Sequence, residues 1–539
     1  MAREKRDGQK PRKKEANQHQ QENKQIAQRL ARALDGYSGG AKGDSKGGAK
    51  ASAAKSGGKR NAQAGRSDRD GGKKAASSDS RRFEKAANKP SKGVKAAKAA
   101  KSDKRIAKPK KEQSAKQLVE ELDSPCKVDA LCGGCMNVAV SYKQQLADKD
   151  FQVRGLLYEA GLLGKGVDVR VVKGMDDPFH YRNKVVSPFA RGRKVKQATG
   201  KDKAKDKGRR NKLDCEILTG MYQAGTHQLV STDGCLIENK QANKVVKVVK
   251  NLMIHHGIAP YDEDSGTGFM RHVVVRVGHQ SGEVLVTLVT NQRDFPSSKS
   301  FCRELISRCP FVTTVVQNVN TRQTNVILGV EEHVLYGPGF ILDTLCGLSF
   351  RISSQSFYQV NATQTEVLYN TAIQLAQLTG TETVIDAYCG TGTIGLVAAK
   401  NGAAQVIGVD SVFSSISDAC NNAKHNSIEN AQFVVKDAGD AMRDWAAEGR
   451  LDPAQTVLMM DPPRAGSDEA FLEATCQLAP SRIVYISCNP ATQARDMQYL
   501  VKRGYCLQVV QPVDMFPHTD HVESVALLTR KAGEAEEAR

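Results

Sequence analysis

The pattern of apolar and polar positions changes character near residue 350. Upstream of it, apolar and polar residues alternate over short stretches, which predicts β-strands. The strands predicted here are 167–172, 185–189, 272–277, 283–290, 312–318 and 324–328. An amphipathic helix is predicted before them at 141–160, and a second helix among them at 235–254. Many short strands with few helices are typical of an α+β module dominated by antiparallel pairing.

Downstream of residue 350, strand and helix patterns alternate. The predicted strands are 383–386, 406–410, 432–436, 456–461, 483–487, 506–514 and 524–529, and the predicted helices are 360–378, 392–401, 412–427, 469–478 and 492–503. This alternation predicts an α/β doubly wound sheet, mostly parallel, that binds ligands at the carboxyl ends of its strands. No helix of usable length separates the last two strands, so we expect them to pair as an antiparallel edge. That ending is typical of methyltransferases that use S-adenosylmethionine (SAM).

The charge of the chain is concentrated in two segments. Residues 1–110 contain 32 Lys and Arg and 11 Asp and Glu. The remaining residues, 111–539, contain 47 basic and 48 acidic residues and are close to neutral. Residues 191–212 contain 11 basic and 2 acidic residues. Both segments have too few large apolar residues to form a core. The predicted division is a disordered polybasic arm at 1–113, a β-rich domain at 114–350 with a flexible basic insert at 191–212, a SAM-binding domain at 351–533, and a tail at 534–539.

The arm has two interpretations. It is either a solvated tail that aids solubility or an electrostatic tether to nucleic acid, which adds affinity without sequence specificity. We favour the tether. The basic first ten residues are not followed by an apolar run, so we expect no signal peptide, and no stretch is long enough to span a bilayer. The 13 cysteines do not form a small secreted framework. We therefore expect reduced thiols in a cytoplasmic protein, with no membrane and no obligate protein partner implied.

A glycine-rich loop provides the first candidate site. Gly390, Gly392 and Gly395 follow a predicted strand and open a helix, a context shared by proteins that bind NAD and SAM. Asp410 ends the next strand, where ribose hydroxyls are expected. Asp386 precedes the loop and either meets the ammonium group of the cofactor or positions the loop. Asp461, followed by Pro-Pro-Arg464, ends a later strand and favours SAM.

A cysteine beside this loop indicates the chemistry. Cys488 lies just past an apolar strand, where packing does not require a thiol, whereas Cys476 reads as a packing residue. A thiol with an ordinary pKa of about 8.5 is a soft nucleophile at neutral pH. Soft nucleophiles suit addition to carbon 6 of a pyrimidine, which lets carbon 5 attack the methyl group of SAM. A base must then remove the carbon-5 proton, and Glu523, just before the last strand, is the best candidate.

Five motifs in order resemble the RNA 5-methyluridine (uracil-5-) methyltransferase family. They occupy residues 353–361, 386–392, 461–466, 487–490 and 518–523. The resemblance covers about residues 116–530 and implies methyl transfer from SAM to carbon 5 of a uridine in RNA. It implies that Cys488 is the nucleophile and Glu523 the base, with Arg464 assisting at the pyrimidine or the nearby backbone. The residues that it implies as SAM contacts are Gln359, Tyr388, Thr393, Asp410, Asp437 and Asp461.

Cys126, Cys132 and Cys135 lie within ten residues and predict a shared metal centre. Four thiolates can hold zinc or an iron–sulfur cluster, and the spacing leaves both open. The 23S rRNA-modifying branch of the family that the chain resembles uses this pattern for a [4Fe-4S] cluster. That resemblance implies Cys235 as the fourth ligand, with Cys215 as the alternative.

The RNA substrate has three interpretations. The cysteine group favours 23S rRNA, tRNA is the nearest alternative, and a noncatalytic RNA-binding factor is disfavoured because nucleophile, base and cofactor loop are all present. Residues 180–184 (His-Tyr-Arg-Asn-Lys) either stack on an unpaired base and grip phosphate or form an ordinary edge strand.

Overall fold

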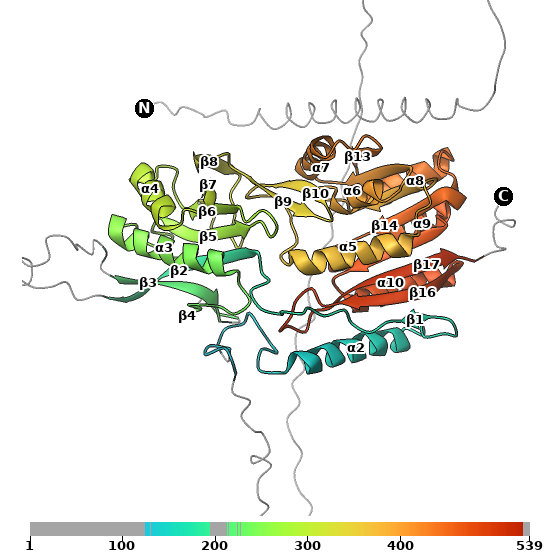
Figure 1. Cartoon of the computed structure of the whole chain (residues 1–539), viewed down its shortest axis with the longest axis horizontal. Coiled ribbons are helices and arrows are strands. Elements are labelled where there is room, and N and C mark those ends of the chain that lie inside the picture. The colour runs from blue at the N-terminus through green and yellow to red at the C-terminus, as the bar shows by residue number, and fades with distance from the viewer. Residues whose placement is uncertain are drawn as a thin grey trace, which may run out of the picture. The chain divides into compact units, whose positions relative to one another are not determined.

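The computed structural model describes residues 124–129, 131–194, 213, 215–223, 225–226 and 228–531. The predicted arm at 1–113, the tail at 534–539 and most of the 191–212 insert lie outside these residues. Two large β-sheets with helices packed on them make up the described part (Figure 1). In that part, no helix combines the length and apolar character that crossing a membrane requires.

The larger sheet has eight strands in the order β1-β16-β17-β15-β14-β11-β12-β13. Its strands are β1 (Asp168–Val169), β11 (Thr383–Ala387), β12 (Gln405–Asp410), β13 (Ala431–Val435), β14 (Thr456–Met460), β15 (Arg482–Ser487), β16 (Tyr505–Val513) and β17 (Glu523–Arg530). Its helices are α2 (Tyr142–Glu159), α5 (Ala362–Ala376), α6 (Thr393–Lys400), α7 (Phe413–His425), α8 (Ala438–Glu448), α9 (Glu469–Leu478) and α10 (Pro490–Lys502). Every pairing is parallel except those of β17, so the predicted doubly wound fold with an antiparallel last strand is confirmed.

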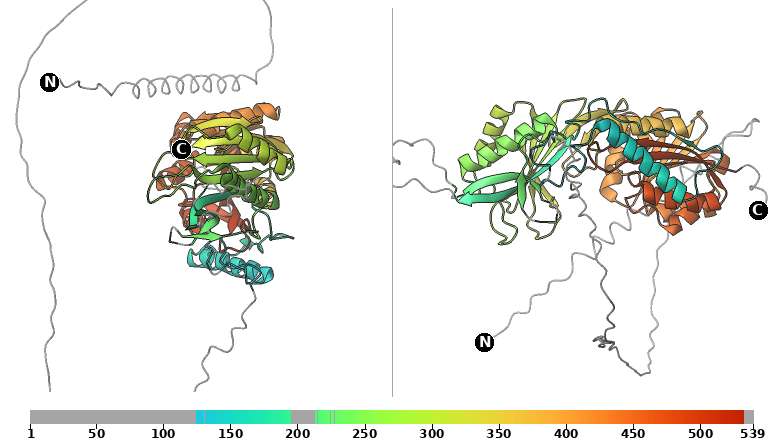
Figure 2. Two further views of the ribbon diagram at one scale, coloured as in Figure 1. Left: turned by 90° about the vertical axis from the view of Figure 1, so that its left-hand side faces the viewer. Right: turned by 90° about the horizontal axis from the view of Figure 1, so that it is seen from below.

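The predicted antiparallel edge is wrong in one respect. β17 lies between β15 and β16, and β1 pairs with β16 on its outer side, so β1 forms the edge. The strand expected at 167–172 in the β-rich module therefore belongs to the larger sheet. Val153 and Leu157 of α2 are buried in the same core, α2 packs against α10, and Figure 2 shows α2 (teal) beside the red segments at the end of the chain. Residues upstream of the β-rich module thus complete the sheet formed by the end of the chain.

The second sheet has seven strands in the order β4-β3-β2-β5-β6-β7-β8. They are β2 (Lys184–Lys194), β3 (Cys215–Tyr222), β4 (Leu229–Ser231), β5 (Met270–Val277), β6 (Val284–Thr290), β7 (Val312–Val319) and β8 (Glu331–Tyr336). Helices α3 (Lys240–His256) and α4 (Ser298–Arg308) pack together and onto this sheet (Figure 1). All pairings are antiparallel except that of β6 with β7, which α4 connects. β2 and β3 pair antiparallel on either side of the basic insert, as a hairpin requires.

The strand predicted at 324–328 is wrong, because the strand that pairs with β7 is β8, which begins later, at Glu331. Two buried asparagines of the preceding segment bind the backbone of this stretch instead. Asn320 Nδ2 donates to the carbonyls of Val326 and Ile327, and Asn318 exchanges hydrogen bonds with Gly329. Side-chain bonds of this kind satisfy backbone groups without a partner strand.

The helix predicted at 235–254 begins later, at Lys240. Asn239 caps it by accepting hydrogen bonds from the N–H groups of Gln241 and Ala242. Gly257, with φ of 69°, ends it. Cys235 is therefore in the turn before the helix. The sequence patterns also missed α4, α8 and the small hairpin of β9 (Ile341–Leu345) and β10 (Leu348–Ile352), which leads into the first motif.

Candidate active site

The predicted cofactor residues gather at the carboxyl ends of the parallel strands. Tyr388 follows β11, Asp410 ends β12, Asp437 follows β13 and Asp461 follows β14. β11 lies between β12 and β14, so the chain changes direction across the sheet here. The crevice at such a point is where open α/β sheets bind ligands.

The glycine loop is held by two carboxylates. Asp386 is buried and its Oδ2 accepts a hydrogen bond from Gly395 N at 2.8 Å, so it positions the loop, one of the two predicted roles. A Cβ atom on Gly395 would lie 2.8 Å from the same oxygen, which explains the glycine. Asp410 Oδ2 accepts from Gly390 N at 3.1 Å. Burial raises the pKa of Asp386 to about 7, with Asp461 and Asp410 adding to the rise.

Three of the remaining candidate cofactor residues lie by this loop or at a neighbouring strand end, and Gln359 lies in the segment before α5. Thr393 is the first residue of α6, and its hydroxyl lies 3.1 Å from that of Tyr369. Tyr388 has φ of 63° and packs on Phe471. Gln359, whose carbonyl accepts from Asn183 Nδ2 just before β2, is half-buried. Asp437 is exposed and caps α8 through Asp440 N. Thr393, Tyr388 and Asp437 lie at this edge of the sheet, and the contacts of all four residues with SAM stay a prediction.

Cys488 and Glu523 face each other across two neighbouring strands. β15 and β17 pair antiparallel with Ser487 opposite Ser524, so the next position along places Cys488 opposite Glu523. Residues directly opposite in such a pair have Cβ atoms about 5 Å apart. Glu523 is only 4% exposed, whereas Cys488 is half-buried and can be reached from outside.

The electrostatics of this pair differ from the simple expectation for a free thiol. Burial raises the pKa of Cys488, Glu523 and Asp461 raise it further, and the Arg464 guanidinium opposes them. Burial, aided by Asp461, raises the pKa of Glu523 to about 8, and burial raises that of Asp461 to about 7. The thiol is therefore less acidic than a free thiol. These are strongly perturbed carboxyls of the kind that cluster at catalytic sites.

Tyr369 is a site residue that the sequence patterns missed. It is 3% exposed, lies on α5 and contacts Thr393. Burial raises the pKa of its hydroxyl, and Asp461 and Glu523 raise it further, so it lies among the site carboxylates. A tyrosine in a helix carries no local signal for such a role.

The four predicted metal ligands are near enough to affect one another's pKa, but no three of their sulfur atoms lie within 4.8 Å of one another, so the shared metal centre stays a prediction. Burial raises the pKa of Cys135 to about 12, and Cys235, Cys132 and Cys126 each raise it further. Cys235 itself has a pKa raised to about 11 by burial, with Glu238 and Cys132 contributing. Cys215, the alternative fourth ligand, is buried in β3 instead. Thiols that oppose one another's ionisation in this way suit a shared cation, because a metal replaces their protons.

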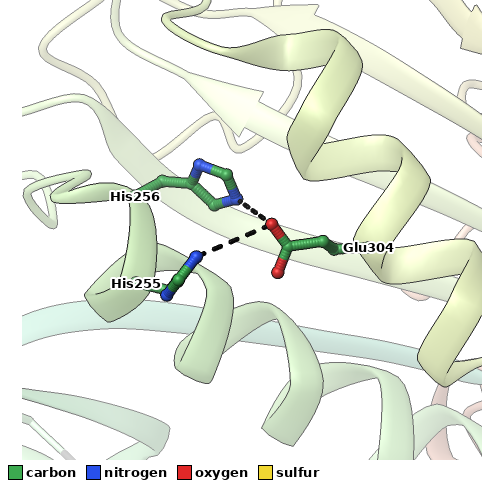
Figure 3. Close-up of side chains that lie close together, drawn as sticks. All are labelled: His255, His256 and Glu304. Carbon is green, nitrogen blue, oxygen red and sulfur yellow. Dashed lines mark ion pairs between the residues drawn. The ribbon is translucent and has the colours of Figure 1, made fainter. Parts of the chain in front are cut away.

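Among the described residues, the possible ligand atoms that lie within 4.8 Å of one another belong to a different group. His255 and His256 end α3 and face Glu304 of α4, with ring Nε2 to Oε1 distances of 3.7 and 3.1 Å (Figure 3). Glu304 Oε2 also pairs with Arg308 at 2.9 Å. Because the Arg308 guanidinium already neutralises the charge of the Glu304 carboxylate, this group needs no metal ion.

For residues 180–184, the edge-strand interpretation is wrong and stacking by Tyr181 is excluded, while phosphate contacts of the basic residues stay a prediction. Tyr181 is buried and donates a hydrogen bond to Pro517 O at 3.1 Å, so it is not available to stack on a base. Lys184 begins β2, which lies between β3 and β5 and is not an edge strand.

Comparisons with known proteins agree with this arrangement. Residues 344–531 match the model of the tRNA (uracil-5-)-methyltransferase family. An uncharacterised RNA methyltransferase of Halalkalibacterium halodurans is 43% identical over 413 residues, which cover 76% of this chain and 84% of that protein. An uncharacterised RNA methyltransferase of Bacillus cereus is 41% identical over 406 residues, which cover 75% of this chain and 83% of that protein. The crystal structure of the Pyrococcus abyssi tRNA (uracil-54, C5)-methyltransferase in complex with S-adenosyl-L-homocysteine matches with a TM-score of 0.56 and 26% identity, covering 74% of this chain and 86% of that one.

Proposed function

The chain belongs to the uracil-5-methyltransferase family of SAM-dependent RNA methyltransferases, and we propose that it methylates carbon 5 of a specific uridine in 23S rRNA in the cytoplasm. The facing positions of Cys488 and Glu523 at the cofactor edge support this chemistry most directly. The four-cysteine group supports the rRNA branch, and the Pyrococcus abyssi enzyme keeps tRNA as the alternative substrate.

The proposed mechanism uses two residues in sequence. The Cys488 thiolate adds to carbon 6 of the uracil, and the electron density that reaches carbon 5 forms the new bond to the methyl group. SAM, when bound, would supply that methyl group as its bond to the sulfonium sulfur breaks, and would leave as S-adenosylhomocysteine. Glu523 then takes the proton from carbon 5, the carbon–sulfur bond breaks, and the thiolate leaves with the 5,6 double bond restored. The high pKa of Glu523 suits a base that must hold a proton near neutral pH. Arg464 opposes the rise in the pKa of the thiol and so favours the nucleophilic form.

The choice between rRNA and tRNA is tested by mapping 5-methyluridine in RNA from cells with and without the gene. We expect a single class of 23S rRNA positions to lose the modification, because the cysteine group marks that branch. Loss from tRNA with intact 23S rRNA would instead support the alternative. Purified protein acting on both RNAs distinguishes a direct from an indirect effect.

We also propose that Cys126, Cys132, Cys135 and Cys235 hold a [4Fe-4S] cluster, with zinc as the alternative. Protein purified without oxygen should contain about four iron and four sulfide per chain. A Cys235→Ala variant should lose most of the iron, whereas Cys215→Ala should keep it. Stoichiometric zinc without sulfide would contradict the cluster and leave the four ligands in place.

A further inference from the structure

The inner face of α2 is polar where it meets the end of the chain. Val153 and Leu157, in its second half, are buried in the core of the larger sheet. One and two turns earlier on the same face, Lys149 and Gln145 are equally buried, at 2% and 1% exposed. Burying an amide and an ammonium group is costly unless each has partners. Their partners lie on the loop between β16 and β17, residues 514–522, which we call the β16–β17 loop.

Three residues of α2 bind this loop. Lys149 Nζ lies 2.6 Å from Asp514 Oδ1 and donates to Phe516 O at 3.1 Å. Tyr142 donates from its hydroxyl to Asp514 Oδ2 at 2.8 Å. Gln145 Oε1 accepts from the N–H of His518 at 2.9 Å, and Gln145 Nε2 lies 3.2 Å from the His518 ring.

The segment that follows Cys135 binds the same loop from another side. The N–H groups of Met136 and Asn137 both donate to His518 O at 3.0 Å. Asn137 Nδ2 donates to Asp520 Oδ1 at 2.6 Å. Gln145 connects this segment to α2, since its Nε2 also donates to Asn137 O at 2.9 Å. His518 has φ of 67°, a backbone conformation that is unfavourable for a residue with a side chain. The hydrogen bonds to its N–H and carbonyl groups stabilise this conformation.

The β16–β17 loop bears directly on both reacting groups. It ends at Glu523, the first residue of β17. His521 Nδ1, near its end, lies 3.2 Å from Arg464 Nη2, and the Arg464 guanidinium is close enough to Cys488 to lower the pKa of its thiol. A shift of the loop therefore displaces the carboxylate, and displacements of about 1 Å at such sites cost roughly 100-fold in rate.

We propose that Gln145 and Asn137 are positioning residues for the base, holding the β16–β17 loop so that Glu523 reaches the carbon-5 proton. The proposal rests on the proposed chemistry of Cys488 and Glu523. Proton removal is the step that releases the enzyme from the RNA, because the carbon–sulfur bond breaks as the carbon-5 proton is taken. A poorly placed base therefore leaves the methylated RNA attached to Cys488.

The test uses the full chain, SAM and an RNA fragment containing the uridine, with the reaction stopped in detergent and the RNA–protein adduct measured on a denaturing gel. Gln145→Met keeps the size of the side chain and removes its hydrogen bonds. We expect it to lower kcat by roughly 10- to 100-fold, to raise the adduct present at steady state, and to lower the KM for RNA by a similar factor, because only a step after methyl transfer is slowed. Gln144→Met is the matched control, since Gln144 is the exposed neighbour on the same helix. It should behave as the parent enzyme.

Asn137→Ala and Asp520→Ala remove an exposed contact and leave the core intact, so they keep the test valid if Gln145→Met unfolds. Both should raise the adduct, and the double variant should add little to either. A fall in kcat without more adduct, or adduct unchanged in all these variants, would overturn the proposal. If the parent enzyme forms no adduct with 5-fluorouridine RNA, the proposed chemistry itself fails. If the parent does form that adduct, failure of the variants counts against the positioning role alone.

Discussion

Cys488→Ala should abolish methyl transfer to RNA, lowering kcat by roughly 10⁴- to 10⁶-fold, as removal of a covalent nucleophile does. Carbon 5 of uracil is unreactive until a nucleophile adds at carbon 6, and no other described cysteine faces Glu523 across β15 and β17. The measurement is transfer of a labelled methyl group from SAM into RNA, with the product analysed as 5-methyluridine. SAM binding should persist, because the thiol lies one strand beyond Asp461.

Cys476→Ala is the matched control for this variant. Cys476 is also half-buried, but it lies on α9 and packs against the core. It should retain activity. 5-Fluorouridine RNA should form a stable adduct with the parent enzyme and with Cys476→Ala and none with Cys488→Ala. Residual methylation by Cys488→Ala would show that the chemistry does not pass through this thiol.

Glu523→Gln should stop the reaction after methyl transfer and accumulate an RNA–protein adduct on unmodified RNA. The amide keeps the size of the carboxyl but cannot accept the carbon-5 proton, so the carbon–sulfur bond stays. Turnover should fall by roughly 10²- to 10⁴-fold, the usual contribution of a general base, while one methyl group per enzyme is still transferred. Glu448→Gln, at an exposed acid of α8, should leave turnover unchanged. Loss of turnover without adduct would assign Glu523 to an earlier step.

The same variant should change the dependence of stability on pH. The pKa of Glu523 is raised from 4.5 to about 8 by burial and by Asp461. The parent chain therefore loses stability as pH rises through this range, because ionising the buried carboxyl is unfavourable. Glutamine carries no such penalty. The melting temperature of Glu523→Gln should exceed that of the parent above pH 8 and match it below pH 4.5, where both side chains are neutral. Equal melting temperatures at alkaline pH would contradict the raised pKa.

The fold was predictable wherever a local pattern determines it. Strand and helix alternation after residue 350 was sufficient because each apolar strand is buried on both faces of a parallel sheet. The pattern failed where side chains replace backbone partners, as Asn318 and Asn320 do for the stretch taken as a strand. It also could not assign β1 to its sheet, since a two-residue strand has no periodicity of its own.

The positions of the candidate site residues in the fold were predictable from the sequence. Their pKa values and their tertiary contacts were not. Strand ends placed Asp410, Asp461 and Cys488 at one edge, because parallel strands share that edge. The raised pKa of Cys488 depends on burial and on the nearby Glu523 and Asp461, and that of Glu523 depends on burial and on Asp461. No local pattern encodes these surroundings. Tyr369, on α5, and the contact of Gln145 with His518, 373 positions apart, arise only from tertiary packing.

The docking of α2 on the last strands has a consequence for synthesis on the ribosome. At about 5–20 residues per second, the 373 positions between Gln145 and His518 take roughly 20–75 s to translate. During that time α2 has been made but its docking surface has not, and long-range contacts of this kind also fold slowly. Catalytic competence is therefore among the last properties that the growing chain acquires.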